Sequence, residues 1–503
     1  MLPYLLGLLG FLLALYYGFL APPQQPYGVP AVPFWVSLLP LIKDVDQEEV
    51  FLHYIAPLLR EKGAVKIFFA GQWNVLVQRP SLVAEIFKRE DIYHKRGNQK
   101  KIPHSVLAEF LDLSHAGSNI ISARGEEWRR YRNVVQPGLL PSALAVEPLV
   151  EHTQQLCKWL LHLQKARGSY GVVVQEVLQR YSSANFLHCV LGQPEVARTM
   201  MGDQPAPPLH QLQLTLKRYL FRPLFMSFPV LDQLSALIPS RIRARQLVRS
   251  FAAALQSTIL RDGADSQHRF ESSLGSRLAQ AWREGNLSDK EFRDNLMVLY
   301  VAGQENPQLL MISTLYLLAK YPDVQSRLRE EIRSSGLTTI SATHPDWTRL
   351  PYLTAVILES LRLFPPISQL INRQVAQPTQ LGHEIELPEG MCVGYHSYAT
   401  NRDEEAWGPS AHEFQPTRWG STDQEISRTY RRAKARAEFI SFHGGARACL
   451  GEKFAMLQMR ILLVGLLHRL TWRLDESWVP RMVPAGPLHP RGLRLVFSRC
   501  DQE

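Results

Sequence analysis

Phe442-His-Gly-Gly-Ala-Arg-Ala-Cys449-Leu-Gly451, near the C-terminus, is the most informative stretch of this chain. A long apolar helix pattern begins directly after it, at Lys453. A cysteine just before a helix is stabilised as a thiolate, because free N–H groups and the helix dipole favour negative charge there. Gly445 and Gly451 let the backbone approach a flat cofactor without a Cβ in the way. The chemistry that needs this arrangement is thiolate ligation of a haem iron.

The same ten residues resemble the cysteine signature of the cytochrome P450 family, F-x-x-G-x-R-x-C-x-G. All five fixed positions match: Phe442, Gly445, Arg447, Cys449 and Gly451. The resemblance implies that Cys449 ligates the iron of haem b (iron protoporphyrin IX) and that Arg447 binds a haem propionate. The alternative is a buried structural cysteine beside a glycine turn, and the surrounding sequence must decide between the two.

Glu359-Ser-Leu-Arg362 lies in a helix-like run that ends at Phe364-Pro365. Its Glu and Arg are three residues apart and share one helix face. A surface ion pair is the commonest fate of such a spacing, but the flanks are apolar and favour a buried pair, in which a lone charge would be costly. The motif resembles the family's E-x-x-R helix, with Arg418 as the third partner. The resemblance implies a structural, non-catalytic triad that holds the cysteine loop.

Two further arginines are candidate propionate ligands. Trp128-Arg-Arg-Tyr-Arg132 resembles the family's W-x-x-x-R helix, and Arg373 follows Phe364-Pro365 at the family's spacing for another such arginine. Arginine suits this role because its planar fork binds carboxylates bidentately. The alternative for each is a solvated surface arginine, and for Arg373 only the spacing argues against it.

The run Ala302-Gly303-Gln304-Glu305-Asn306-Pro307 resembles the family's A-G-x-[DE]-T helix above the haem. The resemblance implies that Ala302 and Gly303 open a groove for oxygen and that Glu305 is the acid of the proton steps. Asn306 replaces the usual threonine; it can hydrogen-bond water but is not a hydroxyl relay. Pro307 favours a local kink. A similar Gly-x-Glu-Asn helix occurs in the fungal subgroup that includes the dityrosine-forming enzyme of yeast spore walls.

Residues 1–21 are almost wholly apolar and carry no charged side chain, which is about the length that spans a bilayer. A cleaved secretory signal is disfavoured because no basic segment precedes the apolar run. We therefore expect a transmembrane anchor at 1–21, a proline-rich linker at 22–45 and a single haem domain at 46–503. The resemblance implies a single-pass protein of the endoplasmic reticulum membrane, with a cytosolic catalytic domain that leaves the sequon at Asn286 unused.

The chain has 503 residues and a net charge of +10, from 56 basic and 46 acidic side chains. Its five cysteines are odd in number and scattered, which favours a reducing compartment. No nucleic-acid-binding module is evident. Basic clusters at Arg129-Arg130 and at 431–436 are candidates for docking an acidic electron donor, or form an ordinary solvated surface. The resemblance implies NADPH-cytochrome P450 reductase and cytochrome b5 as partners.

The expected fold is mostly α with a small β subdomain, the triangular prism that the resemblance implies. A hairpin is predicted over 65–77 around Gly71, a short helix at 80–89, helices through most of 140–335 and strands within 367–396. The stretch 401–436 is predicted to be a long irregular loop.

The function implied is a haem-thiolate monooxygenase that oxidises a small, mainly apolar or aromatic metabolite, in fungal secondary metabolism. It would use O2 and electrons from NADPH, with Glu305 and Asn306 serving the proton steps. Segments 118–122, 299–302, 367–370 and 487–489 are expected to line the substrate site. Three alternatives stay open: oxidative phenol coupling without oxygen insertion, a reductase-independent peroxide isomerase or dehydratase, and a non-catalytic haem protein.

Overall fold

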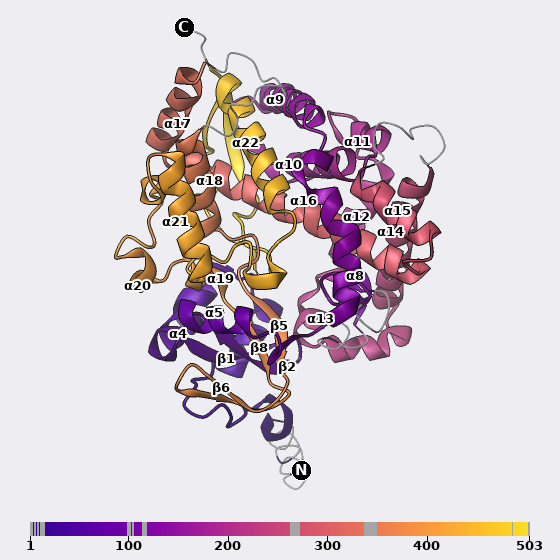
Figure 1. Ribbon diagram of the computed structural model, residues 1–503, viewed down its shortest axis with the longest axis vertical. Helices are drawn as coiled ribbons and strands as arrows, with labels where there is room; N and C mark the ends of the chain where they lie inside the picture. Colours follow the sequence, from indigo (N-terminus) through magenta and orange to yellow (C-terminus); the bar gives the residue numbers. More distant parts are fainter. Residues whose placement is uncertain are drawn as a thin grey trace.

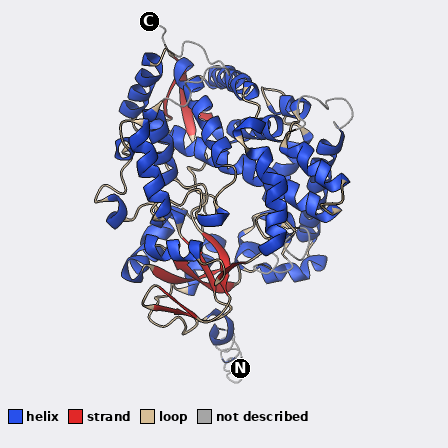
Figure 2. Ribbon diagram, in the orientation of Figure 1, coloured by secondary structure: helices blue, strands red, loops and turns tan. Residues whose placement is uncertain are grey.

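Helices dominate the fold, with one sheet at one end of the molecule and a smaller sheet at the other (Figure 2). The computed structural model describes residues 4, 7, 10, 16–97, 102, 105–112, 118–261, 272–336, 350–484 and 486–500. The α-helices are α2 (Leu39–Ile42), α3 (Gln47–Val50), α4 (Ala56–Lys62), α5 (Pro80–Lys88), α7 (Val106–Leu111), α8 (Gly125–Val135), α9 (Glu147–Arg167), α10 (Val174–Asn185), α11 (Pro194–Met200), α12 (Pro208–Leu220), α13 (Pro223–Ser227), α14 (Pro239–Arg261), α15 (Leu274–Arg283), α16 (Asp289–Lys320), α17 (Pro322–Ser334), α18 (Pro351–Leu363), α19 (Ser397–Thr400), α20 (Glu404–Trp407), α21 (Asp423–Ala435) and α22 (Glu452–Arg469).

Shorter 3-10 and π-helical turns connect these helices. They are η1 (Tyr16–Leu20), η2 (Phe34–Leu38), η3 (Phe51–Ile55), η4 (Gln136–Leu139), η5 (Pro141–Ala143), η6 (Phe186–Val190), η7 (Pro229–Leu237), η9 (Pro416–Trp419) and η10 (Gly445–Arg447). No helix in the described part of the chain is both long and apolar enough to cross a membrane. The predicted anchor at residues 1–21 lies largely outside the described residues.

The strands are β1 (Ala64–Phe69), β2 (Gln72–Val77), β3 (Tyr93–Lys95), β4 (Val172–Val173), β5 (Leu370–Val375), β6 (Thr379–Leu381), β7 (Ile385–Leu387), β8 (Cys392–Tyr395), β9 (Leu470–Leu474) and β10 (Arg494–Arg499). The larger sheet has the order β1-β2-β8-β5-β3, and a second sheet has the order β4-β10-β9. The predicted hairpin is confirmed: β1 and β2 pair antiparallel, and Ala70 and Gly71 turn between them with positive φ. The strands predicted within 367–396 are confirmed as β5 to β8.

The helix α16 crosses the middle of the molecule and organises the core (Figure 1). Its N-terminus is fixed by a capping box, in which Ser288 and Glu291 satisfy each other's backbone N–H groups. Most of its side chains are buried, and it packs against α10, α14, α15 and α18. A helix buried on nearly all sides provides a rigid wall for a site in the core.

The prediction of an irregular loop over 401–436 is wrong in its last third, where α21 forms. Thr422 and Glu425 make a second capping box, and Ile426 and Ala433 provide the buried face of the helix. The prolines and glycines earlier in the stretch dominate its overall character, so the amphipathic spacing of its final residues is easily missed. The first part of the stretch contains only the short elements α20 and η9.

Candidate haem-binding site

A cavity of about 320 Å³ lies between the cysteine loop and α16. One wall is formed by the loop that contains Phe442, Arg447 and Cys449. The other is a stripe of α16 side chains at helical spacing: Leu299, Ala302, Gly303, Asn306, Pro307 and Leu310. The structure therefore brings the cysteine signature and the predicted distal helix face to face across one cavity.

The cysteine loop is held in shape by its own backbone. The N–H of Cys449 donates to the carbonyl of Phe442 at 2.9 Å, and Gly451 is the residue before α22 begins. Burial raises the pKa of the Cys449 thiol, while hydrogen bonds from the N–H groups of Gly451 and Glu452 act in the opposite direction. The N–H groups at the start of α22 therefore favour the thiolate, but the pKa of the thiol remains above its ordinary value.

Gly445 is also required for packing within the protein, a reason that the sequence did not suggest. Its φ is +63°, a left-handed conformation that favours glycine. A Cβ there would lie 2.7 Å from the carbonyl oxygen of Phe87 at the end of α5. The glycine therefore lets the loop pack closely on α5.

Three cations meet beside the cysteine loop. The Arg132 Nη1 donates to the carbonyl of Ala446 at 2.7 Å, so α8 is tied directly to the loop. Two guanidinium groups contact the ring of Trp128, with the Arg447 Cζ 4.1 Å and the Arg132 Cζ 5.1 Å from its centroid. Lys95 also lines the cavity. This rim carries an excess of positive charge.

Glu90, which was not predicted from the sequence, contacts both Arg447 and a further arginine, Arg373. Its Oε1 lies 2.7 Å from the Arg447 Nε and 3.5 Å from the Arg373 Nη1. Arg373 is almost fully buried and does not line the cavity itself. No local pattern marks Glu90, because its partners are more than 280 residues away in the sequence.

The cationic rim fits an acidic group. The Arg447 Nη1 and the Arg373 Nε are buried and have no hydrogen-bond partner among the described residues. Burying such donors without acceptors is unfavourable. The arginines also repel one another. Burial lowers the pKa of Arg447, and the positive charges of Arg373 and Arg132 lower it further. The propionates of a haem placed over Cys449 would supply an acceptor for Arg447, which lines the cavity, so this rim fits that cofactor. Arg373 is connected to the rim through the Glu90 carboxylate that it shares with Arg447.

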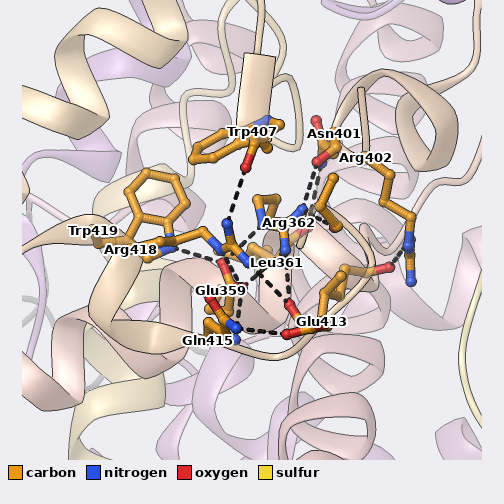
Figure 3. Close-up of polar contacts among 12 residues, drawn as sticks. Glu359, Leu361, Arg362, Asn401, Arg402, Trp407, Glu413, Gln415, Arg418 and Trp419 are labelled. Atoms are coloured by element: carbon orange, nitrogen blue, oxygen red, sulfur yellow. Dashed lines mark hydrogen bonds and ion pairs between the residues drawn. The ribbon is translucent and has the colours of Figure 1, made fainter. Parts of the chain in front are cut away.

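The predicted triad forms, and it is buried as expected (Figure 3). Glu359 accepts hydrogen bonds from Arg362 at 2.8 and 2.9 Å and from Arg418 at 2.8 Å. The indole N–H of Trp419 adds a fourth bond at 3.0 Å, which was not predicted. Arg362 also donates to the carbonyls of Asn401, Ala411 and Glu413. Helix α18 is thereby fastened to the segment that leads toward the cysteine loop.

Asn306 and Glu305 are adjacent in α16 but face different surroundings. Asn306 lines the cavity, and its Nδ2 donates to the carbonyl of Ala302 at 3.2 Å. Glu305 does not line the cavity; its carboxylate lies 2.6 Å from the Lys217 Nζ of α12. The structure therefore does not bring the predicted acid and its neighbour together at the site.

Gly303 gives room to a neighbouring ring. A Cβ at this position would lie 2.0 Å from the Cε2 of Phe186 in η6, and both residues line the cavity. The glycine thus allows an aromatic side chain to press against the backbone of α16. Phe186 was missed by the sequence reasoning, since nothing in its local pattern marks it.

Three of the four predicted substrate segments line the cavity. They contribute Ile120, Ile121, Leu299, Ala302, Ile367 and Leu370. No residue of 487–489 does so, although Pro487 pairs with Ile367 in a β-bridge.

Side chains of α16 hold the first of these segments in place. The Asn295 Oδ1 accepts from the N–H of Ile120 at 2.9 Å, and Ser118 bridges Asp112 and Asp294, donating to Asp112 at 2.7 Å. Both aspartates are buried. This polar cluster, which the sequence reasoning did not find, anchors the wall that carries Ile120 and Ile121.

Comparisons with known proteins agree with this geometry. A family profile described as Cytochrome P450 matches residues 26–495. The chain is 39% identical to Cytochrome P450-DIT2 of Saccharomyces cerevisiae, over 99% of each chain. It is 37% identical to Cytochrome P450 monooxygenase xanG of Aspergillus fumigatus, over 93% of this chain and 86% of the relative. A solved zebrafish cytochrome P450, in a structure with abiraterone, superposes with a TM-score of 0.67 at 19% identity, over 88% and 98% of the two chains, which shows a shared fold.

Proposed function

This chain belongs to the cytochrome P450 family, and we propose that it is a haem-thiolate monooxygenase that oxidises a small, mainly apolar or aromatic molecule. It is an oxidoreductase, like the relatives that it matches. The observation that carries the proposal is the placement of Cys449 in a cavity faced by α16, with an arginine donor at its rim, the Arg447 Nη1, that has no partner among the described residues. A thiolate-ligated haem, when bound there, supplies reductive activation of O2.

The chain's own residues would divide the work around that cofactor. Cys449 would provide the iron ligand, and Arg132, Arg447 and Arg373 would neutralise the propionates, with the Trp128 ring in contact with the first two guanidinium groups. Phe442, Ala302 and Gly303 would line the space on either side of the cofactor. Asn306 would hold a water or a polar group against α16. The apolar side chains Ile120, Leu299 and Ile367 would exclude bulk water and select an apolar or aromatic substrate.

The test of this assignment is spectroscopic. The reduced, haem-loaded protein should form a carbon monoxide complex with a thiolate-type Soret band. The Cys449→Ala variant should lose that band, whereas Cys500→Ala, at a cysteine that does not line the cavity, should keep it. A Cys449→Ala protein that retained the band would show that another residue is the ligand.

Oxidative phenol coupling without oxygen insertion is the second candidate function. Two observations favour it: Asn306 supplies no hydroxyl, and Glu305 is engaged by Lys217 away from the cavity. The resemblance of this helix to that of the dityrosine-forming subgroup points the same way. Turnover under isotopically heavy O2 separates the two, because insertion places label in the product and coupling does not. A peroxide isomerase would instead turn over without NADPH.

We infer that the electron donor, NADPH-cytochrome P450 reductase, docks on the face formed by α8 and α21. The cysteine loop lies between these helices (Figure 1). Arg132 ties α8 to this loop, and Lys434 of α21 pairs with Glu452 at the start of α22. Arg129, Arg431 and Arg432 are exposed around this face. Such a basic face would steer an acidic donor, reductase or cytochrome b5, toward the haem edge.

We also propose attachment to the endoplasmic reticulum membrane through residues 1–21, with 22–45 as linker and 46–503 as the cytosolic haem domain. The support is an exposed apolar patch, defined as Trp35, Ile42, Leu224, Val230, Leu234 and Leu237. Its two parts, η2/α2 and α13/η7, are in contact, and Ser227 donates to the carbonyl of Ser37 at 3.3 Å. A patch of this kind indicates contact with an apolar surface.

A further inference from the structure

A second cavity, of about 190 Å³, lies between η3, α4 and the stretch that runs from α19 to α20. It shares no lining residue with the cavity beside Cys449. An engineered cavity of about 150 Å³ is enough to hold benzene, so the second cavity has room for one ring with a small polar group. Its apolar lining consists mainly of buried side chains, namely Phe51, Ala56, Leu59 and Tyr398.

Arg402 brings a positive charge to the buried part of this cavity. Its side chain lines the cavity, although the residue is only 8% exposed. The guanidinium Cζ lies 3.6 Å from the centroid of the Tyr398 ring, and the Nη1 donates to the carbonyl of Leu363 at the end of α18. Figure 3 shows the side chain turned away from Glu359 and its partners.

The other N–H groups of Arg402 are available to a ligand. Among the described residues, none accepts a hydrogen bond from its Nε or Nη2, and no carboxylate forms an ion pair with it. Burial lowers the pKa of Arg402, as expected for a cation that is removed from water without a counter-charge. Such a cation is unfavourable until an anion binds it.

Two further arginines line the second cavity nearer the solvent, Arg60 of α4 and Arg79 just before α5. Within the described part of the chain, neither side chain makes a hydrogen bond or an ion pair. The field of Arg402 also reaches the cavity wall: burial, and next the charge of Arg402, lowers the pKa of His412. The second cavity therefore favours a negatively charged group at its buried end.

Three carboxylates line the same cavity without pairing with these arginines. The Asp403 Oδ1 accepts from the N–H of Ala406 at 3.0 Å and caps α20. The Glu404 Oε1 lies 3.4 Å from the His412 Nε2, and both Glu404 and Glu405 are exposed. Because they add negative charge near the opening, they disfavour a ligand that carries more than one negative charge.

We propose that the second cavity is a binding site for a small monocarboxylate with one aromatic ring. The carboxylate would accept from the Nε and Nη2 of Arg402, the geometry in which a guanidinium binds carboxylates most strongly. The ring would pack against Phe51, Leu59 and Tyr398, and Arg60 and Arg79 would attract the anion to the opening. This site is separate from the haem chemistry and does not depend on the proposed function.

Calorimetric titration of the haem-loaded protein with four probes tests the ligand class. Benzoate should bind saturably with a Kd of about 1 mM or lower, a reasonable affinity for a ligand of its size. Benzyl alcohol and benzylamine, which carry the ring without the negative charge, should bind at least about tenfold more weakly, since a hydrogen bond to a charged group is lost. Inorganic phosphate, which has no ring and a higher charge, should also bind more weakly.

Hydrogen exchange locates the bound benzoate. Exchange should become slower within 51–63 and 398–412, whereas exchange within 299–310 and the position of the Soret band should not change. A shifted Soret band with protection of 299–310 would show that benzoate enters the haem cavity instead, and would overturn the proposal. Equal binding of benzoate and benzyl alcohol, or of benzoate and phosphate, would also overturn it.

Three substitutions and a control connect binding to the arginines. Arg402→Gln should weaken benzoate binding about tenfold or more. Arg60→Gln and Arg79→Gln should each weaken it about two- to fivefold, because both side chains are exposed, and these two variants decide the outcome if Arg402→Gln does not fold. Lys62→Gln removes a positive charge from the same helix outside the cavity and should leave the affinity unchanged. Unchanged affinity in Arg60→Gln and Arg79→Gln would contradict the site.

Discussion

At the scale of single residues, the most informative outcome is the position of Glu305. Its neighbour in sequence lines the cavity, but successive helix residues point about 100° apart, and the Glu305 carboxylate meets α12. There it contacts the Lys217 Nζ at 2.6 Å and the Gln213 Nε2 at 3.4 Å. Both members of the pair are partly exposed. Its first role in this structure is to join α12, which covers the core, to α16.

Replacement of either partner should therefore have the same consequence. Glu305→Gln and Lys217→Met should each lower stability by about 0.5–1 kcal/mol, since a partly exposed pair is screened by solvent. The double variant should be no less stable than either single one. Thermal unfolding of the four proteins measures this, and parallel assays should show equal losses of turnover in the two single variants. Slower turnover in Glu305→Gln alone would return Glu305 to a proton-transfer role.

Asp112 and Asp294 provide a second prediction, which concerns pH. Burial, together with the charge of Asp294, raises the pKa of Asp112 to about 6. Because the folded-state pKa is above the unfolded value, ionisation opposes folding: stability falls as pH rises from about 4 to 6 and stays low above it. Asp112→Asn should therefore stabilise the protein at pH 7.5 by on the order of 1–3 kcal/mol, and by less at pH 5.

Unfolding temperatures at the two pH values test this prediction. Asp232 is the matched control, since it is equally buried but binds the Arg241 guanidinium through both oxygens, at 2.6 and 2.9 Å. Asp232→Asn should destabilise the protein at both pH values, because it leaves a buried guanidinium without its counter-charge. A lower unfolding temperature of Asp112→Asn at pH 7.5 would show that the ionised carboxylate of Asp112 stabilises the fold.

At the scale of elements, the fastening of α18 to the segment before the cysteine loop matters most. Glu359 and Arg362 are completely buried, and the side chain of Arg418 is nearly so. The two arginines donate hydrogen bonds to carbonyls within 401–413. Glu359 is the counter-charge that lets both guanidinium groups be buried there. The loop that carries Cys449 is thus positioned by a charge network far from the chemistry.

Glu359→Ala should remove haem incorporation and not merely slow the enzyme. Breaking a buried ion network costs about 3–5 kcal/mol, because two guanidinium groups would remain without a counter-charge. The ratio of haem to protein and the soluble yield measure the effect, with Glu330→Ala on the exposed side of α17 as the matched substitution. A soluble, haem-loaded Glu359→Ala protein would contradict the assignment of a locking role.

The N-terminal linker is another element with a specific attachment. The buried Lys66 Nζ donates to the carbonyls of Pro23, Gln24 and Pro26 at 2.9, 3.2 and 3.4 Å. Backbone bonds between Lys66 and residues 30–32 add a parallel bridge at the edge of β1. One lysine therefore holds the proline-rich segment against the sheet.

Lys66→Met should release this segment while the haem domain stays folded. Amide exchange and proteolysis within 20–32 should become faster, whereas the Soret spectrum should not change. Lys62→Met is the control, because among the described residues the Lys62 side chain makes a single ion pair, which is exposed, with Glu384 at 3.8 Å. Unaltered protection of 20–32 in Lys66→Met would show that the backbone bridge alone holds the linker.

At the scale of the whole molecule, charge and apolar surface are segregated. The exposed basic side chains of α8 and α21 lie around the cysteine loop, whereas the apolar patch lies on η2, α2, α13 and η7. A molecule built this way can contact lipid with one surface and an acidic donor with another. The proposed membrane attachment should therefore have two components, the N-terminal segment and this patch.

Deletion of residues 1–21 should leave a protein that still associates with liposomes through the patch. Adding Ile42→Glu and Leu237→Glu, which place charge on its two most exposed residues, should abolish that residual binding. Co-sedimentation with vesicles compares the full-length protein, the deletion variant and the deletion variant with both substitutions. The control is Val479→Glu in the deletion variant, at an exposed apolar residue outside the patch. Glycosylation of Asn286 in microsomes would contradict the cytosolic placement.

The sequence by itself determined the elements whose residues are close together along the chain. The cysteine loop, the Glu359–Arg362 pair, the β1–β2 hairpin and the distal helix each depend on a short spacing that local geometry dictates. Such spacings place residues on one helix face or in one turn whatever surrounds them. The family, and with it the haem site centred on Cys449, could therefore be predicted.

Only the tertiary structure decided which side chains meet across the chain. The Arg447–Glu90 contact joins residues 357 apart, and Ser118 and Asp294 are 176 apart. The same is true of Lys217, which draws Glu305 from its expected place, and of Phe186, whose ring occupies the space that Gly303 leaves. These pairings depend on how whole helices pack, and because packing sums many weak contacts over the entire core, no local spacing encodes it.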